Sequence, residues 1–356
     1  MTIETRPLGR TGADVTILGY GAMELRGRPW GPAMDDEEAG QVLNAVLDGG
    51  ISLIDTSIDY GRSEELIGRY LAYRRDEYFL ASKCGCLLGE PPPGATPPFP
   101  HDYSPGNVRA GIEQSLRRLG TDRLDLVQVH MSPSRGQLEA DGTVETMLTL
   151  RDEGKVRFIG MSGTLPHLPG HIAMGVFDVF QIPYSAIQRE HEDLITAAAA
   201  AGAGTLIRGG AARGAPAEDK DWSQGPIGLR EGEGRRRWES SGVQDLLGGM
   251  TRLEFVLRFT LSHPALSSTI VGTSSMDHLR SNLAVAAKGP LPADLYEEAR
   301  RRLEPPAQYR DQPPGSGQRR ADASAGDRDR PDRPLRESGG WRLYLPDPGD
   351  RRSGSP

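Results

Sequence analysis

Cysteine and lysine are both scarce in this sequence. Its 356 residues include two cysteines, Cys84 and Cys86. They stand two positions apart, so they are too close for an unstrained disulfide, and alone they are too few to hold a metal ion. We therefore expect a cytoplasmic location, where thiols stay reduced. The chain has only four lysines, so Lys83, which ends an apolar segment, is a candidate functional residue.

Long apolar runs and an excess of basic residues are also missing. No apolar stretch reaches the roughly 20 residues that a membrane-spanning helix needs. The N-terminal residues are too polar for a signal peptide. The formal net charge is -7, whereas a nucleic-acid-binding surface requires a basic face. These features exclude membrane and nucleic-acid partners and favour a soluble intracellular protein.

What the sequence does contain is a regular alternation of short apolar segments and amphipathic segments. Strands that are apolar on both faces, separated by helices, indicate a parallel sheet covered by helices. Eight such units in roughly 250 to 290 residues favour a closed (β/α)8 TIM barrel over an open sheet. We predict this barrel for residues 1–304, with a short N-terminal hairpin that turns at 7–12. The expected strands cover 15–23, 51–55, 78–82, 124–130, 156–161, 179–184, 205–207 and 268–271, and expected helices include 107–119, 144–152, 168–174, 194–201, 252–261, 277–287 and 294–303.

Two segments fall outside this alternation. Residues 305–356 are dominated by Pro, Gly, Arg, Asp and Ser, so they cannot bury enough apolar surface to offset the entropy of ordering. We expect a low-complexity, mostly disordered tail. Residues 211–250 read as one long glycine-rich loop, which either closes over a ligand or is a solvated surface excursion.

Chemically useful side chains stand at the ends of three successive expected strands. Asp55, Lys83 and His130 end these strands, and Tyr60 lies in the loop after the first. Each residue alone has an ordinary structural explanation, such as a turn or a core hydrogen bond. In a barrel, however, the carboxyl ends of the strands converge. A lysine buried there requires a counter-charge, which Asp55 can supply.

This group suits the protonation of a carbonyl oxygen. A phenol has an unperturbed pKa of about 10, and a nearby ammonium stabilises the phenolate and lowers that pKa. We expect Lys83 to act on Tyr60 in this way, which would make Tyr60 a general acid. His130 would bind and orient the carbonyl oxygen. The hydride must then come from another molecule.

Over roughly residues 6–289 the sequence resembles the aldo-keto reductases. The motifs that carry the resemblance are LGRTG at 8–12, DTSIDYGRSE at 55–64, Ser82-Lys83, 124–130, 155–162, Gln181 and 273–282. The resemblance implies a (β/α)8 barrel, a nicotinamide cofactor bound without a Rossmann domain and a small-molecule carbonyl substrate. It also implies a catalytic tetrad, which falls on Asp55, Tyr60, Lys83 and His130. It leaves the oligomeric state open.

The resemblance places the cofactor contacts less cleanly. Gly163 stands where the family has asparagine, Arg208 where it has a ring-stacking aromatic, and Gly272 where NADP-preferring members have lysine. Hydroxyls and a helix start still offer donors for a 2′-phosphate, so we predict NADP(H) in preference to NAD(H). We predict no metal ligands. The implied cofactor-binding residues are Gly21, Met23, Ser162, Gln181, Arg208, Gly209, Gly210, Gly272, Thr273, Ser274, His278 and Asn282.

Several alternatives remain open from the sequence. The barrel could sense cofactor state with little turnover, as the resembling potassium-channel β subunits do. A glycoside hydrolase would need a second carboxylate facing Asp55, and Glu64 and Glu65 lie in a helix start. A redox or metal role for Cys84-Gly85-Cys86 lacks neighbouring ligands. Four apolar residues after the first strand either line the substrate pocket or pack in the core, namely Tyr20, Met23, Leu25 and Trp30.

Overall fold

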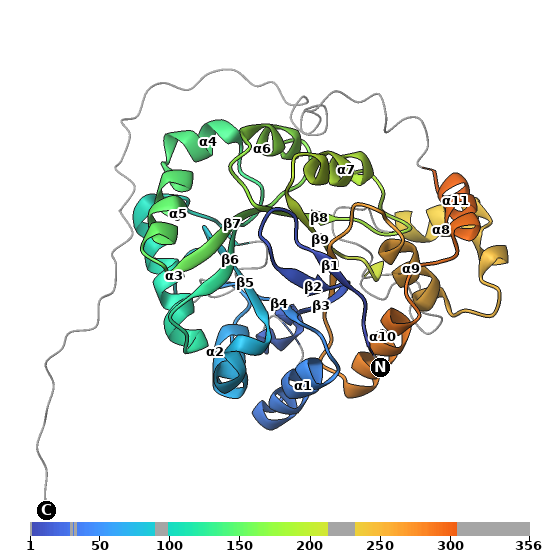
Figure 1. Cartoon of the computed structure of the whole chain (residues 1–356), viewed down its shortest axis with the longest axis horizontal. Helices are drawn as coiled ribbons and strands as arrows, with labels where there is room; N and C mark the ends of the chain where they lie inside the picture. The colour runs from blue at the N-terminus through green and yellow to red at the C-terminus, as the bar shows by residue number, and fades with distance from the viewer. Residues whose placement is uncertain (1, 29–30, 32–33, 90–98, 213–231, 305–356) are drawn as a thin grey trace, which may run out of the picture. The chain divides into compact units, whose positions relative to one another are not determined.

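A closed barrel of eight parallel strands forms the centre of the molecule (Figure 1). The computed structural model describes residues 2–28, 31, 34–89, 99–212 and 232–304. The order around the barrel is β10-β3-β4-β5-β6-β7-β8-β9, with β9 pairing back onto β10. This confirms the predicted (β/α)8 barrel. The strands are β3 (Leu18–Gly21), β4 (Leu53–Asp55), β5 (Phe79–Cys84), β6 (Leu124–Val129), β7 (Val156–Ser162), β8 (Val179–Pro183), β9 (Gly204–Arg208) and β10 (Ser268–Val271).

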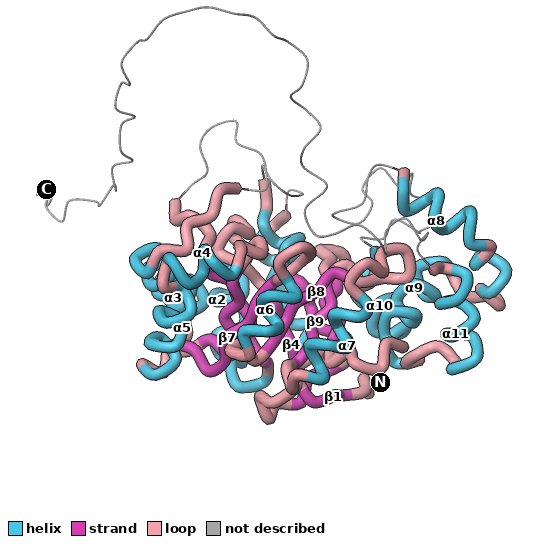
Figure 2. Tube along the Cα trace, turned by 90° about the horizontal axis from the view of Figure 1, so that it is seen from above, coloured by secondary structure: helices cyan, strands magenta, loops and turns pink. Residues whose placement is uncertain are grey.

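Helices surround the barrel and cover the outer faces of its strands (Figures 1 and 2). Side-chain caps set several of their starts: Asp35 accepts from the backbone of Glu37, and Thr251 accepts from that of Glu254. The α-helices are α1 (Asp36–Asp48), α2 (Ser63–Leu71), α3 (Pro105–Leu119), α4 (Arg135–Ala140), α5 (Thr143–Asp152), α6 (Leu168–Met174), α7 (Glu192–Ala200), α8 (Glu233–Ser241), α9 (Arg252–Leu261), α10 (Met276–Ala287) and α11 (Ala293–Arg302). The 3-10 turns are η1 (Ala22–Arg26), η2 (Ala72–Glu77) and η4 (Val243–Leu246).

The predicted N-terminal hairpin closes one end of the barrel. It consists of β1 (Thr5–Pro7) and β2 (Asp14–Thr16), and it lies across the barrel centre in Figure 1. Leu8 and Val15 are fully buried in one cluster with residues at the starts of the strands, such as Leu53 and Phe79. Gly9 has φ +53, and a Cβ there would lie 2.1 Å from the nitrogen of Gly204, so this contact requires glycine. The strands finish at the opposite end of the barrel, which the hairpin does not cover.

The segment predicted as one long loop at 211–250 contains helical structure. Residues 213–231 lie outside the described part of the chain, but α8 and η4 follow them. Trp238 is buried and packs edge-on against Phe255 of α9, with ring centroids 6.0 Å apart. Arg237 pairs with Glu233 one turn earlier, at 2.5 Å. The loop prediction was therefore wrong here, because one buried aromatic anchors a short polar helix.

The predicted tail at 305–356 lies outside the described residues and stays a prediction. Within the part of the chain that is described, no helix combines the length and the apolar character needed to cross a membrane.

We predict that Leu8→Ala destabilises the barrel. Leu8 is 0% exposed, so its truncation leaves a cavity beneath the strands and should lower the free energy of unfolding by about 2–5 kcal/mol. Urea unfolding measures the effect. Leu87→Ala is the matched control, because Leu87 is 46% exposed, and it should change stability by less than about 0.5 kcal/mol. Equal stabilities of the two variants would show that the hairpin is not part of the core.

Candidate active site

A buried ion pair lies at the carboxyl ends of β4 and β5. The ammonium of Lys83 is 2.7 Å from Oδ2 of Asp55, and their side chains are 1% and 2% exposed. The same ammonium donates to the carbonyl oxygen of Thr56, at 2.8 Å. Burial alone would lower the pKa of Lys83, but the carboxylate of Asp55 outweighs burial and raises it. Lys83 therefore stays charged, as predicted from its place at a strand end.

Two amides fix the other oxygen of the same carboxylate. Oδ1 of Asp55 accepts from Nε2 of Gln128 at 2.8 Å and from Nε2 of Gln181 at 2.9 Å. Gln128 pairs with Lys83 in the register of β5 and β6, so both side chains belong to one layer inside the barrel. With donors on both oxygens, Asp55 is held in one orientation. Sequence reasoning missed Gln128, although a glutamine among the apolar residues Leu126, Val127 and Val129 was a usable signal.

Tyr60 lies against this pair from the loop between β4 and α2. Nζ of Lys83 is 5.0 Å from the centroid of the Tyr60 ring. Burial is the largest influence and raises the pKa of the phenol to about 12, although Lys83 pulls in the opposite direction. The prediction that Lys83 brings this pKa toward neutrality was therefore wrong in its net result. Because burial wins, the phenol keeps its proton at neutral pH.

His130 follows β6 and faces the same point. Its ring is edge-on to that of Tyr60, with centroids 6.4 Å apart. Burial lowers the pKa of the imidazole to about 3, against the opposing effect of Asp59. The ring is therefore neutral at physiological pH, and one of its nitrogens carries a proton. The four residues of the expected tetrad thus come together in one place.

The predicted cofactor residues on β7 and β8 are also adjacent. Ser162 donates to the side-chain oxygen of Gln181 at 3.3 Å. The next residue, Gly163, has no room for a side chain, since a Cβ would lie 2.8 Å from Cδ1 of Leu168 and 3.2 Å from Cγ of Met161. A side chain at position 163 would therefore require Leu168 of α6 to shift.

Arg208, Gly209 and Gly210, the predicted cofactor residues at and after the end of β9, have different surroundings. Nε of Arg208 is buried, and it has no hydrogen-bond partner among the described residues. Gly209 has φ +74 and open space around it, as a position close to a ligand requires. At Gly210 a Cβ would lie 2.2 Å from Oγ1 of Thr269. Barrel packing alone can explain the glycine at 210, and its approach to a phosphate stays a prediction.

The last predicted group lies where β10 leads into α10. Thr273 and Asn282 are buried, Ser274 is half-buried and His278 is exposed. Helix α10 starts at Met276, and Ser275 is its N-cap. The hydroxyl next to the first turn therefore belongs to Ser275, whereas the sequence had predicted Thr273 and Ser274 as the cofactor-binding hydroxyls here. Gly272 lies close to the backbone of Gly21: a Cβ at position 272 would be 2.5 Å from the carbonyl oxygen of Gly21. These residues gather at the carboxyl end of the barrel.

Residues weighed as pocket lining belong mainly to the core. Tyr20 is 0% exposed and donates to the carbonyl oxygen of Thr273 at 2.7 Å, and Leu25 is also fully buried. Met23 is half-buried, and Trp30 lies outside the described residues. Glu64, the carboxylate considered for glycoside hydrolysis, accepts from Ser82 at 2.8 Å and is buried. It therefore does not present a second free carboxylate beside Asp55.

Comparisons with known proteins agree on one family. A model of the Aldo/keto reductase family matches residues 17–303. L-galactose dehydrogenase of Arabidopsis thaliana is 28% identical over 302 residues, which cover 80% of this chain and 89% of that protein. Pyridoxine 4-dehydrogenase of Escherichia coli (strain K12) is 29% identical over 282 residues, covering 76% and 89%. The holo structure of aldo-keto reductase AKR11C1 from Bacillus halodurans has a TM-score of 0.73 at 25% identity, covering 84% of this chain and 96% of that one.

We predict that Asp55→Asn destabilises the protein strongly. The substitution keeps the size of the side chain but leaves the ammonium of Lys83 buried without a counter-charge, which should cost about 3–5 kcal/mol. The double variant Asp55→Asn/Lys83→Met carries no uncompensated charge and should recover much of that loss. Denaturant unfolding of the three proteins measures both effects. Asp36→Asn, in an exposed pair with Arg62, is the control and should change little. A single variant as stable as the parent would contradict the role of the pair.

Proposed function

The chain belongs to the aldo-keto reductase family, and on this premise we propose that it reduces an aldehyde or ketone to an alcohol, with a reduced nicotinamide as hydride donor and Tyr60 as proton donor. Members of this family are oxidoreductases of small carbonyl compounds that use nicotinamide cofactors. Two relatives of this chain are named as dehydrogenases, which supports an oxidoreductase.

The observation that carries the proposal is the buried Lys83–Asp55 pair beside the Tyr60 ring. A phenol gives up its proton only if the resulting phenolate is stabilised, and a fixed, buried ammonium nearby does so. Asp55 keeps that ammonium charged and in place. Because the phenol is protonated over the whole neutral range, the acid form is the resting form.

The remaining roles follow from charge and position. The neutral His130 ring can donate one hydrogen bond to the carbonyl oxygen without competing for its proton. Tyr60 then transfers its proton to that oxygen as negative charge develops on it. Lys83 stabilises the phenolate that remains, until solvent returns the proton. In this scheme Gln128 and Gln181 are positioning residues, because they act through Asp55.

The residues at the barrel mouth fit a nicotinamide cofactor. Ser162 at the end of β7 and Gln181, its partner in the register on β8, offer a hydroxyl and an amide, which suits a carboxamide. The unpartnered Nε of Arg208 and the open backbone at Gly209 suit a phosphate-containing ligand. We propose that Thr273, Ser274 and the start of α10 hold a 2′-phosphate, with NADP(H) preferred over NAD(H).

The test of the acid is Tyr60→Phe, which removes the proton but keeps the ring. We expect the kcat of carbonyl reduction to fall by about 10²- to 10⁴-fold, while the Kd for cofactor, measured by fluorescence titration, stays nearly unchanged. Tyr73→Phe, at a side chain that is 77% exposed, is the matched control and should keep full activity.

Two outcomes would count against this proposal. Near-parental turnover by Tyr60→Phe would exclude the phenol as the acid. Failure of the parent protein to oxidise NADPH with any member of a broad aldehyde panel, despite binding it, would instead favour a cofactor-sensing role.

The cofactor preference has its own test. We expect a lower KM for NADPH than for NADH with the same carbonyl substrate, because hydroxyls and helix N–H groups at the start of α10 favour an additional phosphate. A clear preference for NADH would overturn this choice and leave the proposed chemistry intact.

A further inference from the structure

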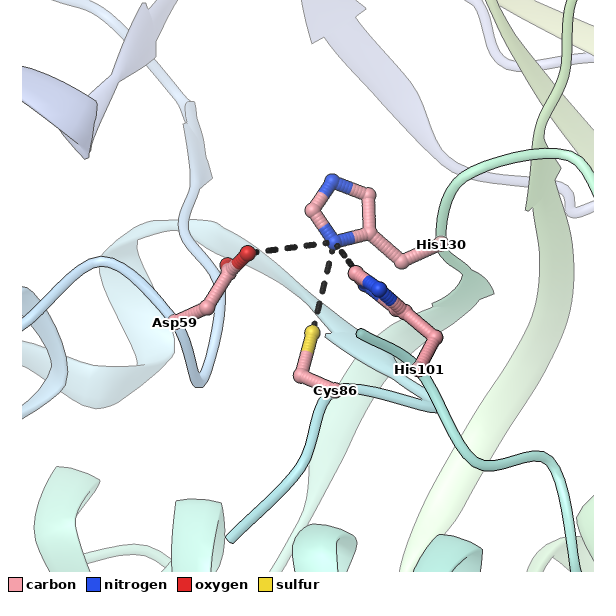
Figure 3. Close-up of side chains that lie close together, drawn as sticks. All are labelled: Asp59, Cys86, His101 and His130. Carbon is pink, nitrogen blue, oxygen red and sulfur yellow. Dashed lines mark hydrogen bonds and ion pairs between the residues drawn. The ribbon is translucent and has the colours of Figure 1, made fainter. Parts of the chain in front are cut away.

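Four side chains with metal-binding atoms converge beside the proposed active site. They come from separate segments: Asp59 from the loop after β4, Cys86 from the turn after β5, His101 from the segment before α3 and His130 from the end of β6. One ligand atom from each lies within 4.8 Å of all the others. Figure 3 shows the other three side chains arranged around one nitrogen of His130. Of the four residues, only His130 has a role in the proposed reduction.

Nδ1 of His130 has more polar partners within reach than one ring nitrogen can bond at the same time. Nε2 of His101 is 3.2 Å away, Sγ of Cys86 is 3.3 Å away and Oδ2 of Asp59 is 3.6 Å away. An imidazole nitrogen has one proton or one lone pair in the ring plane, so it can satisfy one of these partners. A tetrahedral ion with bonds of about 2.0–2.3 Å has ligand atoms about 3.3–3.8 Å apart. The three distances to Nδ1 are close to this range, and since all four ligand atoms lie within 4.8 Å of one another, small side-chain shifts would bring the remaining pairs to it.

A second layer of contacts orients the ligand atoms. Nδ1 of His101 lies 2.8 Å from the carbonyl oxygen of Phe99, so that nitrogen carries the proton and Nε2 turns its lone pair toward the cluster. The hydroxyl of Ser57 donates to Oδ1 of Asp59, at 2.5 Å, and leaves Oδ2 facing His130. The amide of Asn107 donates to the carbonyl oxygen of Cys86, at 3.1 Å. Such outer partners are typical of metal-binding side chains.

We propose that Asp59, Cys86, His101 and His130 bind one divalent metal ion, and that this ion is Zn²⁺. The donor set of one carboxylate, one thiolate and two imidazoles suits Zn²⁺, which takes O, S and N ligands in tetrahedral geometry. The side chains of His130 and Asp59 are 12% and 17% exposed, so an ion can reach the site from solvent. The expectation that Cys86 lacks neighbouring ligands was wrong, because its partners come from three other segments of the chain.

The ion would also set the proton on His130, a consequence that rests on the proposed function. With Nδ1 on the metal, a neutral imidazole carries its proton on Nε2, and that nitrogen points away from the cluster in Figure 3. Nε2 can then donate to the carbonyl oxygen of the substrate. Without the ion, the lone pair of His101 Nε2 favours a proton on His130 Nδ1, and Nε2 becomes an acceptor. The metal thus selects the tautomer that reduction needs.

The test is a metal titration of the full-length protein after chelator treatment, with no cofactor or substrate present. We expect one equivalent of Co²⁺ to bind and to give the visible absorption of a tetrahedral ion together with a near-ultraviolet thiolate-to-metal band. One equivalent of Zn²⁺ should abolish both signals. Cys86→Ala should lose the thiolate band, and His101→Gln should weaken binding by more than about 10-fold, since even loss of an outer partner costs that much.

Cys84→Ala is the matched control, because Cys84 is a buried cysteine two positions away and outside the cluster. It should keep stoichiometry and spectrum. Absence of stoichiometric binding in the parent protein, or an unchanged spectrum in Cys86→Ala, would overturn the site and leave only adventitious surface binding. If Cys86→Ala does not fold, as judged by near-ultraviolet circular dichroism, then His101→Gln carries the test.

Activity separates the two proposals. Zn²⁺ should raise the kcat/KM of the metal-free parent and have no effect on His101→Gln. If the parent binds Zn²⁺ but its turnover does not change, the ion does not control the tautomer of His130, although the metal site itself is supported. If no carbonyl is reduced by metal-loaded protein, the proposed function fails while the binding spectra still report the site.

Discussion

The buried pair of Lys83 and Asp55 is the interaction on which the active site depends. Removing an ammonium and a carboxylate from water is costly, and their attraction offsets that cost only if the remaining hydrogen-bonding positions are filled. Here Thr56 fills a position on the ammonium, and Gln128 and Gln181 fill the free oxygen of the carboxylate. Thr56 follows β4, Gln128 lies in β6 and Gln181 lies in β8. The closed barrel therefore brings together the hydrogen bonds that offset the cost of burying the ion pair.

The same burial decides how the neighbouring groups behave. Tyr60 and His130 are only partly exposed to solvent, and burial is the main reason that the phenol keeps its proton and the imidazole stays neutral. Lys83 acts against burial at Tyr60 but does not overcome it. Under the proposed function, such a site would hold an acid that releases its proton only when negative charge forms on a bound oxygen. At neutral pH the Tyr60 phenol is therefore already in the protonated form that the proposed reaction uses.

Much of the fold was predictable because the barrel strands are apolar on both faces. The bounds of β10, α6 and α9 agree with the predicted 268–271, 168–174 and 252–261. The convergence of Asp55, Lys83 and His130 was predictable because strand ends in a barrel converge. What periodicity could not supply was the path of the loops: nothing in the spacing of Asp59, Cys86 and His101 indicates that they meet. The helix at α8 was missed for a related reason, since the burial of Trp238 against α9 is a tertiary contact that overrides a polar local sequence.

The hairpin beneath the barrel has a consequence for how the protein is made. Its turn pairs with residues far along the chain: Gly9 bridges Ala203, and the backbone of Arg10 donates to Gly202. During synthesis the first dozen residues must wait until the ribosome has released the start of β9 before they can take their places. The hairpin is translated before β9, so it is among the later segments to complete its contacts, and Leu8 and Val15 are buried only then.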